Sequence, residues 1–290
     1  MILQTPREFS FQLCLDFLKR SPKELLHQLR DESVVKAVRM GDEVVVFMVT
    51  SQKNQLNISF LTKEPEEALK QKISAYVREW FDLDTDLKPF YDMAEKDRLL
   101  KDLITRFYGY RIVGQPDLFE SLVWAVLGQQ INLGFAYTLK QRFVQTFGER
   151  LALGDQEYFL FPSPETVSVI TPEKLLDLQF STQKSRYTIA IAEAFADGTL
   201  SKEKIRSLPL QEAKHQLMKI KGVGNWTANY ALMKTFHHPD AFPLEDAGLH
   251  NAIKNLKNLG RKPTLAEVVK IFKKYKGWEA YATLYLWKSL

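Results

Sequence analysis

The pattern of hydrophobic and polar positions changes along the chain, and its first part predicts a sheet. Residues 34–39, 43–50 and 55–62 are short runs rich in β-branched and aromatic side chains, and polar turns separate them. Such runs are typical of strands. The turn at 40–42 joins the first two, so we expect an antiparallel meander. Residues 65–80 predict a helix, because a proline and acidic residues stand at their start.

After about residue 95, helical spacing replaces the strand-like runs, with short glycine and proline breaks between the segments. The fold class that follows is α+β. We expect a small N-terminal antiparallel sheet domain with helices, residues 1–95, and a mainly α-helical domain, residues 96–290. The helices expected in the second domain are 96–107, 116–130, 132–147, 172–179, 183–197, 201–207, 210–220, 225–236, 246–257, 264–275 and 277–288.

Length and composition are those of a globular protein. The chain has 290 residues, of which 45% are hydrophobic and 26% are charged, and these values exclude a disordered chain. Residues 121–139 are uncharged, yet Gln129, Gln130 and Asn132 lie at their centre. Polar groups there are costly in a bilayer, so the stretch predicts a buried helix interrupted by polar residues, and we expect no membrane partner.

The net charge of +5 is small as a total but unevenly distributed. The segment from Ala247 to Leu290 contains nine Lys and Arg residues and two Glu residues, so its net charge is +7. The rest of the chain therefore has a net charge of −2. Basic segments suit sequence-independent contacts to phosphates. A solvated helix face is the alternative for most of these lysines, and Lys273, Lys274 and Lys276 are the best candidates for the phosphate role.

Cys14 is the only cysteine. One thiol forms no internal disulfide, and it excludes a cysteine-rich zinc site or a cysteine-ligated iron–sulfur cluster. A free thiol suits a reducing compartment, and the chain does not open with the basic and apolar segments of a signal peptide. We therefore expect a cytoplasmic protein.

Residues 221–224, Lys-Gly-Val-Gly, predict a tight turn between two helices. Two glycines around one apolar residue expose the backbone, and the helix that starts at Asn225 has free N–H groups at its beginning. Such groups bind a phosphate without a charged side chain. An ordinary helix–turn–helix connection is the alternative for this segment by itself.

A second informative segment, residues 242–250, contains a proline-led turn that ends in Glu245 and Asp246 and then opens a helix. Asp is a common helix N-cap. The functional interpretation of Asp246 is a carboxylate that faces a cleft and is kept charged by the helix N-terminus. The two roles are compatible.

Four motifs, in this order, resemble those of the helix-hairpin-helix DNA glycosylase superfamily, and most closely the bacterial 3-methyladenine DNA glycosylase II enzymes. They are FESLVWAVLGQQIN at 119–132, KIKGVGNWTA at 219–228, FPLEDAGL at 242–249 and WEAYATLYLW at 278–287. The resemblance covers about residues 80–290 and places the helix-hairpin-helix at about 210–236. It implies a helical glycosylase domain, and the N-terminal region fits that enzyme's small TATA-binding-protein-like sheet domain.

The same resemblance implies roles for individual residues. Asp246 is the catalytic carboxylate, and Gln130 is the plug that fills the gap left by a flipped nucleotide, with Ile131 as the alternative. The residues implied in substrate binding are Trp226, Tyr230, Trp278 and Gln129, and Phe17 is a weaker candidate. Those implied in DNA binding, besides Gln130 and Ile131, are Lys219, Lys221, Gly222, Val223, Gly224 and Thr227.

The activity implied is that of a monofunctional glycosylase, which flips an alkylated purine such as 3-methyladenine or 7-methylguanine out of the duplex and hydrolyses the N-glycosidic bond. Trp226 stands where the lyase relatives carry a Schiff-base lysine. A glycosylase for a neutral lesion and a non-catalytic damage-binding protein are the alternatives. We expect damaged double-stranded DNA as the partner, a monomer associated with the bacterial nucleoid, no required cofactor and no catalytic metal. A structural monovalent cation at the hairpin is also implied.

Overall fold

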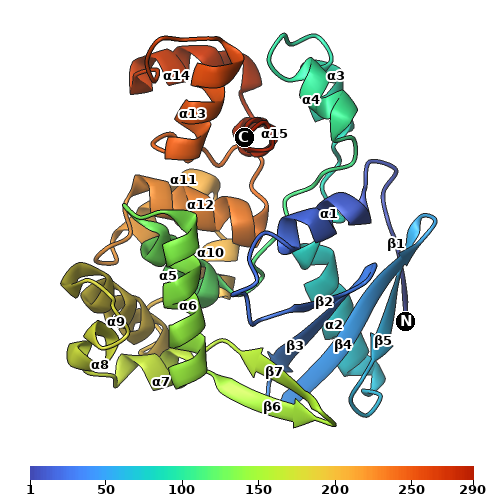
Figure 1. The fold of residues 1–290 in the computed structure, drawn as a ribbon, viewed down its shortest axis with the longest axis vertical. Helices are drawn as coiled ribbons and strands as arrows, with labels where there is room; N and C mark the ends of the chain where they lie inside the picture. Colours follow the sequence, from blue (N-terminus) through green and yellow to red (C-terminus); the bar gives the residue numbers. More distant parts are fainter.

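A computed structural model describes residues 1–290 and has the expected α+β fold. Figure 1 shows the N-terminal sheet at the lower right and most of the later helices to its left and above it. The sheet is antiparallel, with the order β1-β5-β4-β3-β2. Its strands are β1 (Ile2–Gln4), β2 (Gln28–Arg30), β3 (Ser33–Met40), β4 (Glu43–Gln52) and β5 (Gln55–Phe60). The predicted meander is therefore confirmed.

One face of the sheet packs on two helices, α1 (Phe11–Leu18) and α2 (Glu67–Trp80). The expected helix at 65–80 is α2, whereas α1 was not expected. Alternate β3 and β4 side chains such as Val34 and Phe47 point into this core because side chains in a strand alternate between faces. Cys14 is fully buried in it, and burial raises the pKa of its thiol to about 12, so the thiol stays protonated.

The opposite face of the sheet is covered by a hairpin, β6 (Glu149–Leu153) and β7 (Gln156–Leu160), from the second half of the chain. Tyr158 and Leu160 cluster with Val35 and Val46 of the sheet. The sequence did not predict this hairpin, because only Tyr158 and Leu160 of β7 are buried and their partners lie more than a hundred residues earlier. The two halves of the chain therefore interlock.

The helices that follow α2 match most of the expected segments. They are α3 (Lys88–Ala94), α4 (Lys101–Arg106), α5 (Leu118–Gly128), α6 (Leu133–Phe147), α7 (Pro164–Ser168), α8 (Pro172–Leu176), α9 (Thr182–Ala196), α10 (Lys202–Arg206), α11 (Leu210–Met218), α12 (Asn225–Phe236), α13 (Ala247–Leu256), α14 (Leu265–Phe272) and α15 (Glu279–Trp287), with a 3₁₀ turn at Lys273–Tyr275.

Three expected boundaries are wrong by three residues or more, and one of them is the end of the helix expected at 172–179, which stops at Leu176. The helix expected at 96–107 begins only at Lys101, because the Asp97 carboxylate accepts the backbone N–H groups of Leu99 and Leu100 and holds a turn there. The helix expected at 264–275 ends at Phe272, and a 3₁₀ turn follows it. Helices α3 and α7 were not expected.

A buried ion pair network joins the N-terminal domain to α5 and α6. The Lys140 ammonium on α6 lies 2.9 Å from Glu24 Oε2 and 3.0 Å from Glu120 Oε1. The two carboxylates raise the pKa of Lys140 although burial opposes its charge. Breaking a buried pair leaves an uncompensated charge, so this network fixes the N-terminal domain against α5 and α6. None of the helices combines the length and the apolar composition that a membrane span requires.

Candidate active site

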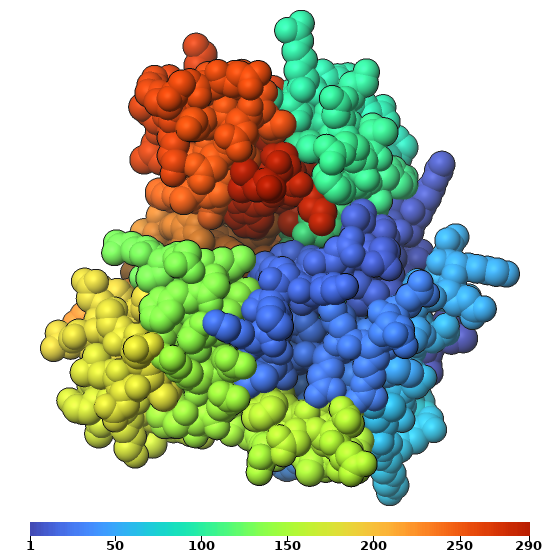
Figure 2. Space-filling model, in the orientation of Figure 1, coloured from blue at the N-terminus to red at the C-terminus, as the bar shows by residue number.

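A cleft between the two halves of the molecule encloses about 1290 Å³. Its walls come from the end of α1, the turn between α5 and α6, the starts of α12 and α13, and the end of α15. In Figure 2 the dark red α15 lies at the centre of this face, between orange and blue-green surfaces and above the green and blue ones. Most small-molecule sites have about 300–1,000 Å³, so this cleft has room for a nucleotide with adjoining backbone.

Asp246 lies in this cleft as the N-cap of α13, and three N–H groups hold its carboxylate. Oδ1 accepts the backbone N–H of Leu249 at 2.7 Å and the indole Nε1–H of Trp287 at 2.7 Å, and Oδ2 accepts the indole Nε1–H of Trp226 at 3.1 Å. A Cβ atom at Gly248 would lie 3.0 Å from Asp246 Oδ1 and 3.3 Å from the Trp287 ring. A glycine there lets the indole reach the carboxylate.

The loop before Asp246 is tied to α12. Asn229 donates through its side chain to the Asn225 carbonyl, at 2.9 Å, and accepts the backbone N–H of Phe242 at 3.0 Å. The Asp246 backbone N–H donates to the Pro243 carbonyl at 3.0 Å. Asn229 is 4% exposed, so its bonds are made in a protected environment, where they fix the loop firmly. The sequence by itself gives Asn229 no role.

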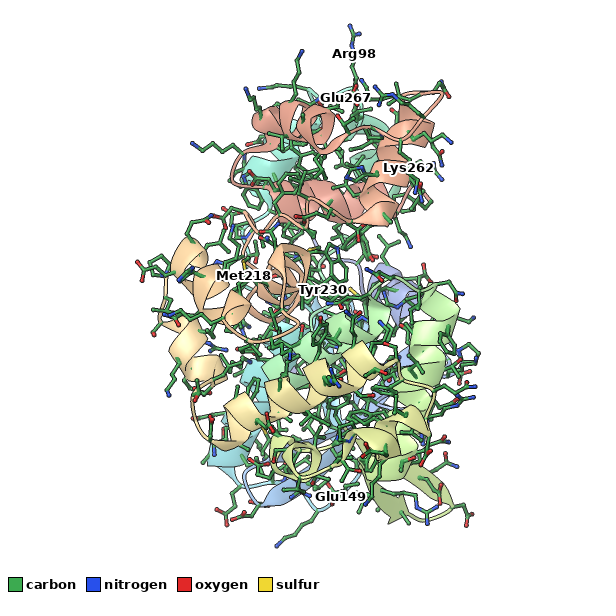
Figure 3. All side chains as sticks on the ribbon, turned by 90° about the vertical axis from the view of Figure 1, so that its left-hand side faces the viewer. Arg98, Glu149, Met218, Tyr230, Lys262 and Glu267 are labelled. Carbon is green, nitrogen blue, oxygen red and sulfur yellow. The ribbon has the colours of Figure 1, made fainter.

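Aromatic side chains form one continuous wall of the cleft. The Trp226 and Tyr230 rings stack with centroids 5.2 Å apart and an angle of 26°. The Tyr230 hydroxyl accepts the indole N–H of Trp124 at 3.0 Å, and the Trp124 ring packs 4.7 Å from that of Tyr137, which does not itself line the cleft. Figure 3 shows Tyr230 in the middle of the molecule. The structure therefore brings together Asp246, Trp226 and Tyr230, and it adds Trp124.

Trp278 lies outside the cleft, which corrects its assignment to the aromatic pocket. It precedes the first residue of α15 and packs against Phe90, at 5.8 Å, and Tyr281, at 6.0 Å. Trp287, at the other end of the same helix, lines the cleft instead. A helix rises about 1.5 Å per residue, so the two indoles are more than two turns apart. The motif at 278–287 contains both tryptophans, and its sequence alone does not show which end of the helix faces the cleft.

The hairpin at 221–224 has the backbone features that the sequence predicts. Gly222 has a φ of 95°, and a Cβ atom there would lie 2.5 Å from Tyr187 Cβ, so only glycine fits. Val223 is 4% exposed and anchors the turn in the core. The backbone N–H groups of Gly224 and Asn225 donate to no other group of the protein. They remain free to bind an anion.

The side chains around the hairpin divide into exposed and buried ones. Lys219 and Lys221 are exposed, as a phosphate contact requires. Thr227 is 1% exposed, and its hydroxyl accepts the side-chain N–H of Gln129 at 3.0 Å. The Thr227 side chain therefore holds Gln129, and the DNA-binding role of Thr227, which also lines the cleft, stays a prediction. The side chain faces inward because it lies on the side of α12 that packs against α5.

The turn between α5 and α6 reaches the rim of the cleft. Gln129 donates to the Gly222 carbonyl at 3.1 Å as well as to Thr227, so its amide binds the hairpin. Gln130 is exposed and has a φ of 56°, a conformation unusual outside glycine. Ile131 is half-buried against the core. Leu133, to which the sequence motifs assign no role, is 51% exposed and also lines the cleft.

Charged side chains frame the cleft. Arg20 places its guanidinium 4.0 Å from the centre of the Phe17 ring, and both residues line the cleft from the N-terminal side. Lys288 lines the opposite side. Glu245, next to the N-cap of α13, is exposed and accepts the Asn225 side-chain amide at 2.9 and 3.0 Å.

The three lysines proposed for phosphate contact, Lys273, Lys274 and Lys276, are all exposed, and Lys274 also forms an ion pair with Asp97. No group of three or more His, Cys, Asp or Glu side chains lies close enough together to hold a metal ion. At the hairpin, the carbonyls of Ile220 and Gly222 each accept one N–H. Each keeps a second lone pair, so a monovalent cation would find acceptors there.

Comparisons with known families agree with this architecture. The model described as "HhH-GPD superfamily base excision DNA repair protein" matches residues 123–277. The chain belongs to this superfamily. The model described as "8-oxoguanine DNA glycosylase, N-terminal domain" matches residues 5–122. The resemblance predicted from the four motifs is confirmed, and so is the fold class.

Individual proteins are similar over the whole chain. A "DNA-3-methyladenine glycosylase" from Bacillus subtilis is 41% identical over 293 aligned residues, which cover 100% of this chain and 97% of the relative. The structure of a 3-methyladenine DNA glycosylase from Archaeoglobus fulgidus has a TM-score of 0.85 at 21% identity, covering 99% and 97% of the two chains. An 8-oxoguanine glycosylase/lyase from Clostridium acetobutylicum has a TM-score of 0.77 at 19% identity, covering 100% and 95%. These two structures establish the fold.

Proposed function

We propose that this HhH-GPD protein is a monofunctional DNA glycosylase that releases alkylated purines of the 3-methyladenine and 7-methylguanine type by hydrolysis. The observation that carries the proposal is Asp246, whose carboxylate lies in a nucleotide-sized cleft and is oriented by two indole N–H groups and a helix N-terminus. The name of the Bacillus subtilis relative supports the choice of substrate.

The chemistry follows from the charge of the substrate. A 3-methylated adenine carries a positive charge on its ring, so the bond between the base and the sugar C1′ breaks with its electron pair going to the base, which leaves neutral. The sugar becomes an oxocarbenium-like cation. Asp246 stabilises this cation electrostatically, and a water molecule attacks C1′ and gives a proton to the carboxylate. Both steps need Asp246 on the sugar side of the cleft.

The aromatic wall suits a flat, cationic base. The indole of Trp226 uses its N–H on Asp246, so its ring is held in a defined plane, stacked on Tyr230. A cation over an aromatic face gains about 0.5–2 kcal/mol. A neutral base stacks on the same wall without this gain, so the wall favours alkylated purines.

DNA contacts are proposed for the groups that remain free at the rim. The exposed Gln130, or Ile131 beside it, fills the gap in the duplex. The N–H groups at the start of α12, with Lys219 and Lys221, bind the phosphates of double-stranded DNA. We further propose that the protein acts as a monomer in the bacterial cytoplasm, at the nucleoid. One chain supplies every group named here.

A panel of single-lesion duplexes tests the proposal against its alternatives. We expect release of 3-methyladenine and 7-methylguanine, measured by chromatography of the free bases. Release restricted to 8-oxoguanine or to deaminated bases would favour the neutral-lesion alternative. Tight binding of every damaged duplex without release of any base would favour the damage-binding alternative.

No covalent intermediate is expected. Trp226 occupies the position of the Schiff-base lysine, and an indole forms no imine. Lys234, further along α12, also lines the cleft, but it is 2% exposed and donates to the Val113 carbonyl. Borohydride therefore leaves protein and DNA unlinked, as denaturing electrophoresis would show. A trapped adduct that disappears in Lys234→Met would place the protein among the lyases.

The indole of Trp287 gives a further prediction. We expect Trp287→Phe to lower the rate of base release about tenfold or more, because the variant loses a hydrogen bond to a charged group worth about 1.5–3 kcal/mol. Single-turnover kinetics on a 7-methylguanine duplex measure the loss. Trp278→Phe is the matched control, since Trp278 lies at the other end of α15, and its rate stays close to that of the wild type. Equal rates in the two variants would contradict the placement of Trp287.

A further inference from the structure

Lys184, on the first turn of α9, makes contacts that the proposed chemistry does not use. Its ammonium donates to the Val126 carbonyl at 2.8 Å and to the Gln129 carbonyl at 2.7 Å. The Val126 carbonyl, in the last turn of α5, also accepts the backbone N–H of Gln129 at 3.2 Å, whereas the carbonyl of Gln129, the C-cap of α5, accepts no backbone N–H. A cation is also favourable at the C-terminal end of a helix. Lys184 therefore caps the C-terminal end of α5, at the point where the turn 129–131 begins.

The environment of Lys184 is costly for a charge. The residue is 7% exposed, and no carboxylate forms an ion pair with it. Burial lowers the pKa of Lys184 to about 8. A lysine is rarely buried without a counter-ion, so the two backbone carbonyls are the partners that keep it in place.

The turn that Lys184 holds is also constrained by the side chain of Gln129. The Gln129 carbonyl is bound by Lys184, while its side-chain amide binds the Gly222 carbonyl and Thr227. Gln130, next along the chain, is exposed with a φ of 56°. The backbone of Gln130 is strained, and it keeps this conformation because Gln129 is fixed at both ends.

Helix α9 contacts both DNA-facing segments. Tyr187, one turn after Lys184, packs on Gly222 of the hairpin so closely that no Cβ atom fits there. The helix thus holds the wedge turn 129–131 through Lys184 and the phosphate-binding hairpin through Tyr187. The distance between these two segments decides whether a side chain enters the duplex while the hairpin grips the phosphates.

We propose that Lys184 is a positioning residue that sets the wedge turn 129–131 against the hairpin and thereby promotes flipping of the target nucleotide; this inference rests on the proposed glycosylase function. Lys184 does not touch the base or the sugar. Its contribution is expected only where a nucleotide has to leave a duplex, since unstacking requires the wedge. In single-stranded DNA the base is already accessible.

The test compares base release from duplex and single-stranded oligonucleotides that carry one 7-methylguanine. We expect Lys184→Met to lower kcat/KM on the duplex about tenfold, the size expected for loss of a charge-assisted hydrogen bond, and to change it less than about threefold on the single strand. Lys184→Arg, which keeps N–H donors, recovers part of the loss. Should Lys184→Met fail to fold, Lys184→Gln carries the same comparison. Equal losses on both substrates, or no loss on the duplex, would overturn the inference.

Lys36→Met is the matched control. Lys36 is also 7% exposed and donates to a backbone carbonyl, that of Leu26 at 3.1 Å, but it lies in the N-terminal sheet away from the wedge turn. Loss of this lysine lowers the thermal midpoint and leaves the ratio of duplex to single-strand rates unchanged. A shift of that ratio in Lys36→Met would show that general loss of stability produces the effect, and would overturn the role of Lys184.

Fluorescence of 2-aminopurine placed beside a lesion reports unstacking without any chemistry. At saturating protein, we expect the wild type to raise the fluorescence and Lys184→Met to raise it less. This measurement separates two failures. If the wild type releases no base from either substrate, the proposed function is wrong, and the fluorescence alone decides about Lys184. Equal signals in both proteins, or no rise with the wild type, would overturn the inference.

Discussion

Asp246→Asn is expected to reduce the release of alkylated purines about 10²–10³-fold or more, because it removes the negative charge that faces the developing cation. The amide of Asn accepts the N–H of Leu249 as the carboxylate does, and Asn caps helices about as well as Asp. The fold is therefore retained, and the loss belongs to the chemical step. Chromatography of bases released from methylated DNA measures it.

Asp117→Asn is the control for this prediction. Asp117 is the N-cap of α5, and its carboxylate accepts the Glu120 N–H at 3.1 Å, so the change at the cap is the same, but Asp117 does not line the cleft. We expect release close to that of the wild type. Full activity in Asp246→Asn, with the fold confirmed by circular dichroism, would contradict the mechanism.

Gly222→Ala is expected to have the largest effect on the structure. A φ of 95° costs a residue with a side chain about 1–3 kcal/mol, and overlap with the Tyr187 side chain adds about 1–3 kcal/mol. The free energy of unfolding therefore falls by several kcal/mol. The hairpin also shifts, so the affinity for undamaged duplex DNA falls with it. Denaturant titration and fluorescence anisotropy measure the two quantities.

Gly41→Ala separates these two causes. Gly41 has a φ of 68° in the turn between β3 and β4, and nothing lies within 4 Å of the position of a Cβ atom. The Gly41→Ala variant has the backbone strain of a positive φ without overlap of its Cβ atom with a neighbour, and position 41 is far from the hairpin in the sequence. We expect it to lose about 1 kcal/mol of stability and to bind DNA as the wild type does. An equal loss of DNA affinity in both variants would show that strain alone, not the hairpin, is responsible.

Much of the architecture was accessible from local patterns. The strands between residues 34 and 62 were predicted because β-branched and aromatic residues cluster there and turns bound them, and β3, β4 and β5 confirm the prediction. The turn at 221–224 followed from its two glycines, and Asp246 was expected at a helix N-cap because of its place after a proline-led turn. Each of these features depends on residues within a few positions of one another.

Features that depend on distant partners were not predicted. The β6–β7 hairpin has strands of five residues and packs on β3, so few of its own residues show the hydrophobic pattern of a strand. Asp246 receives its indole donors from positions 20 and 41 residues away, and of the two C-terminal tryptophans only Trp287 reaches it. Which end of α15 meets the cleft is decided by how the helix packs.

The sequence by itself determined the superfamily, the α+β division, the capping aspartate and the glycine turn, because these are set by short-range conformational preferences and by motifs of fixed spacing. Only the tertiary structure decided that Trp287 rather than Trp278 binds Asp246, that Thr227 and Gln129 hold the hairpin, and that Lys184 closes α5. The physical reason is that a side chain's role here follows from which groups packing brings within hydrogen-bonding distance. Gln129 and Gly222 are 93 positions apart in the chain.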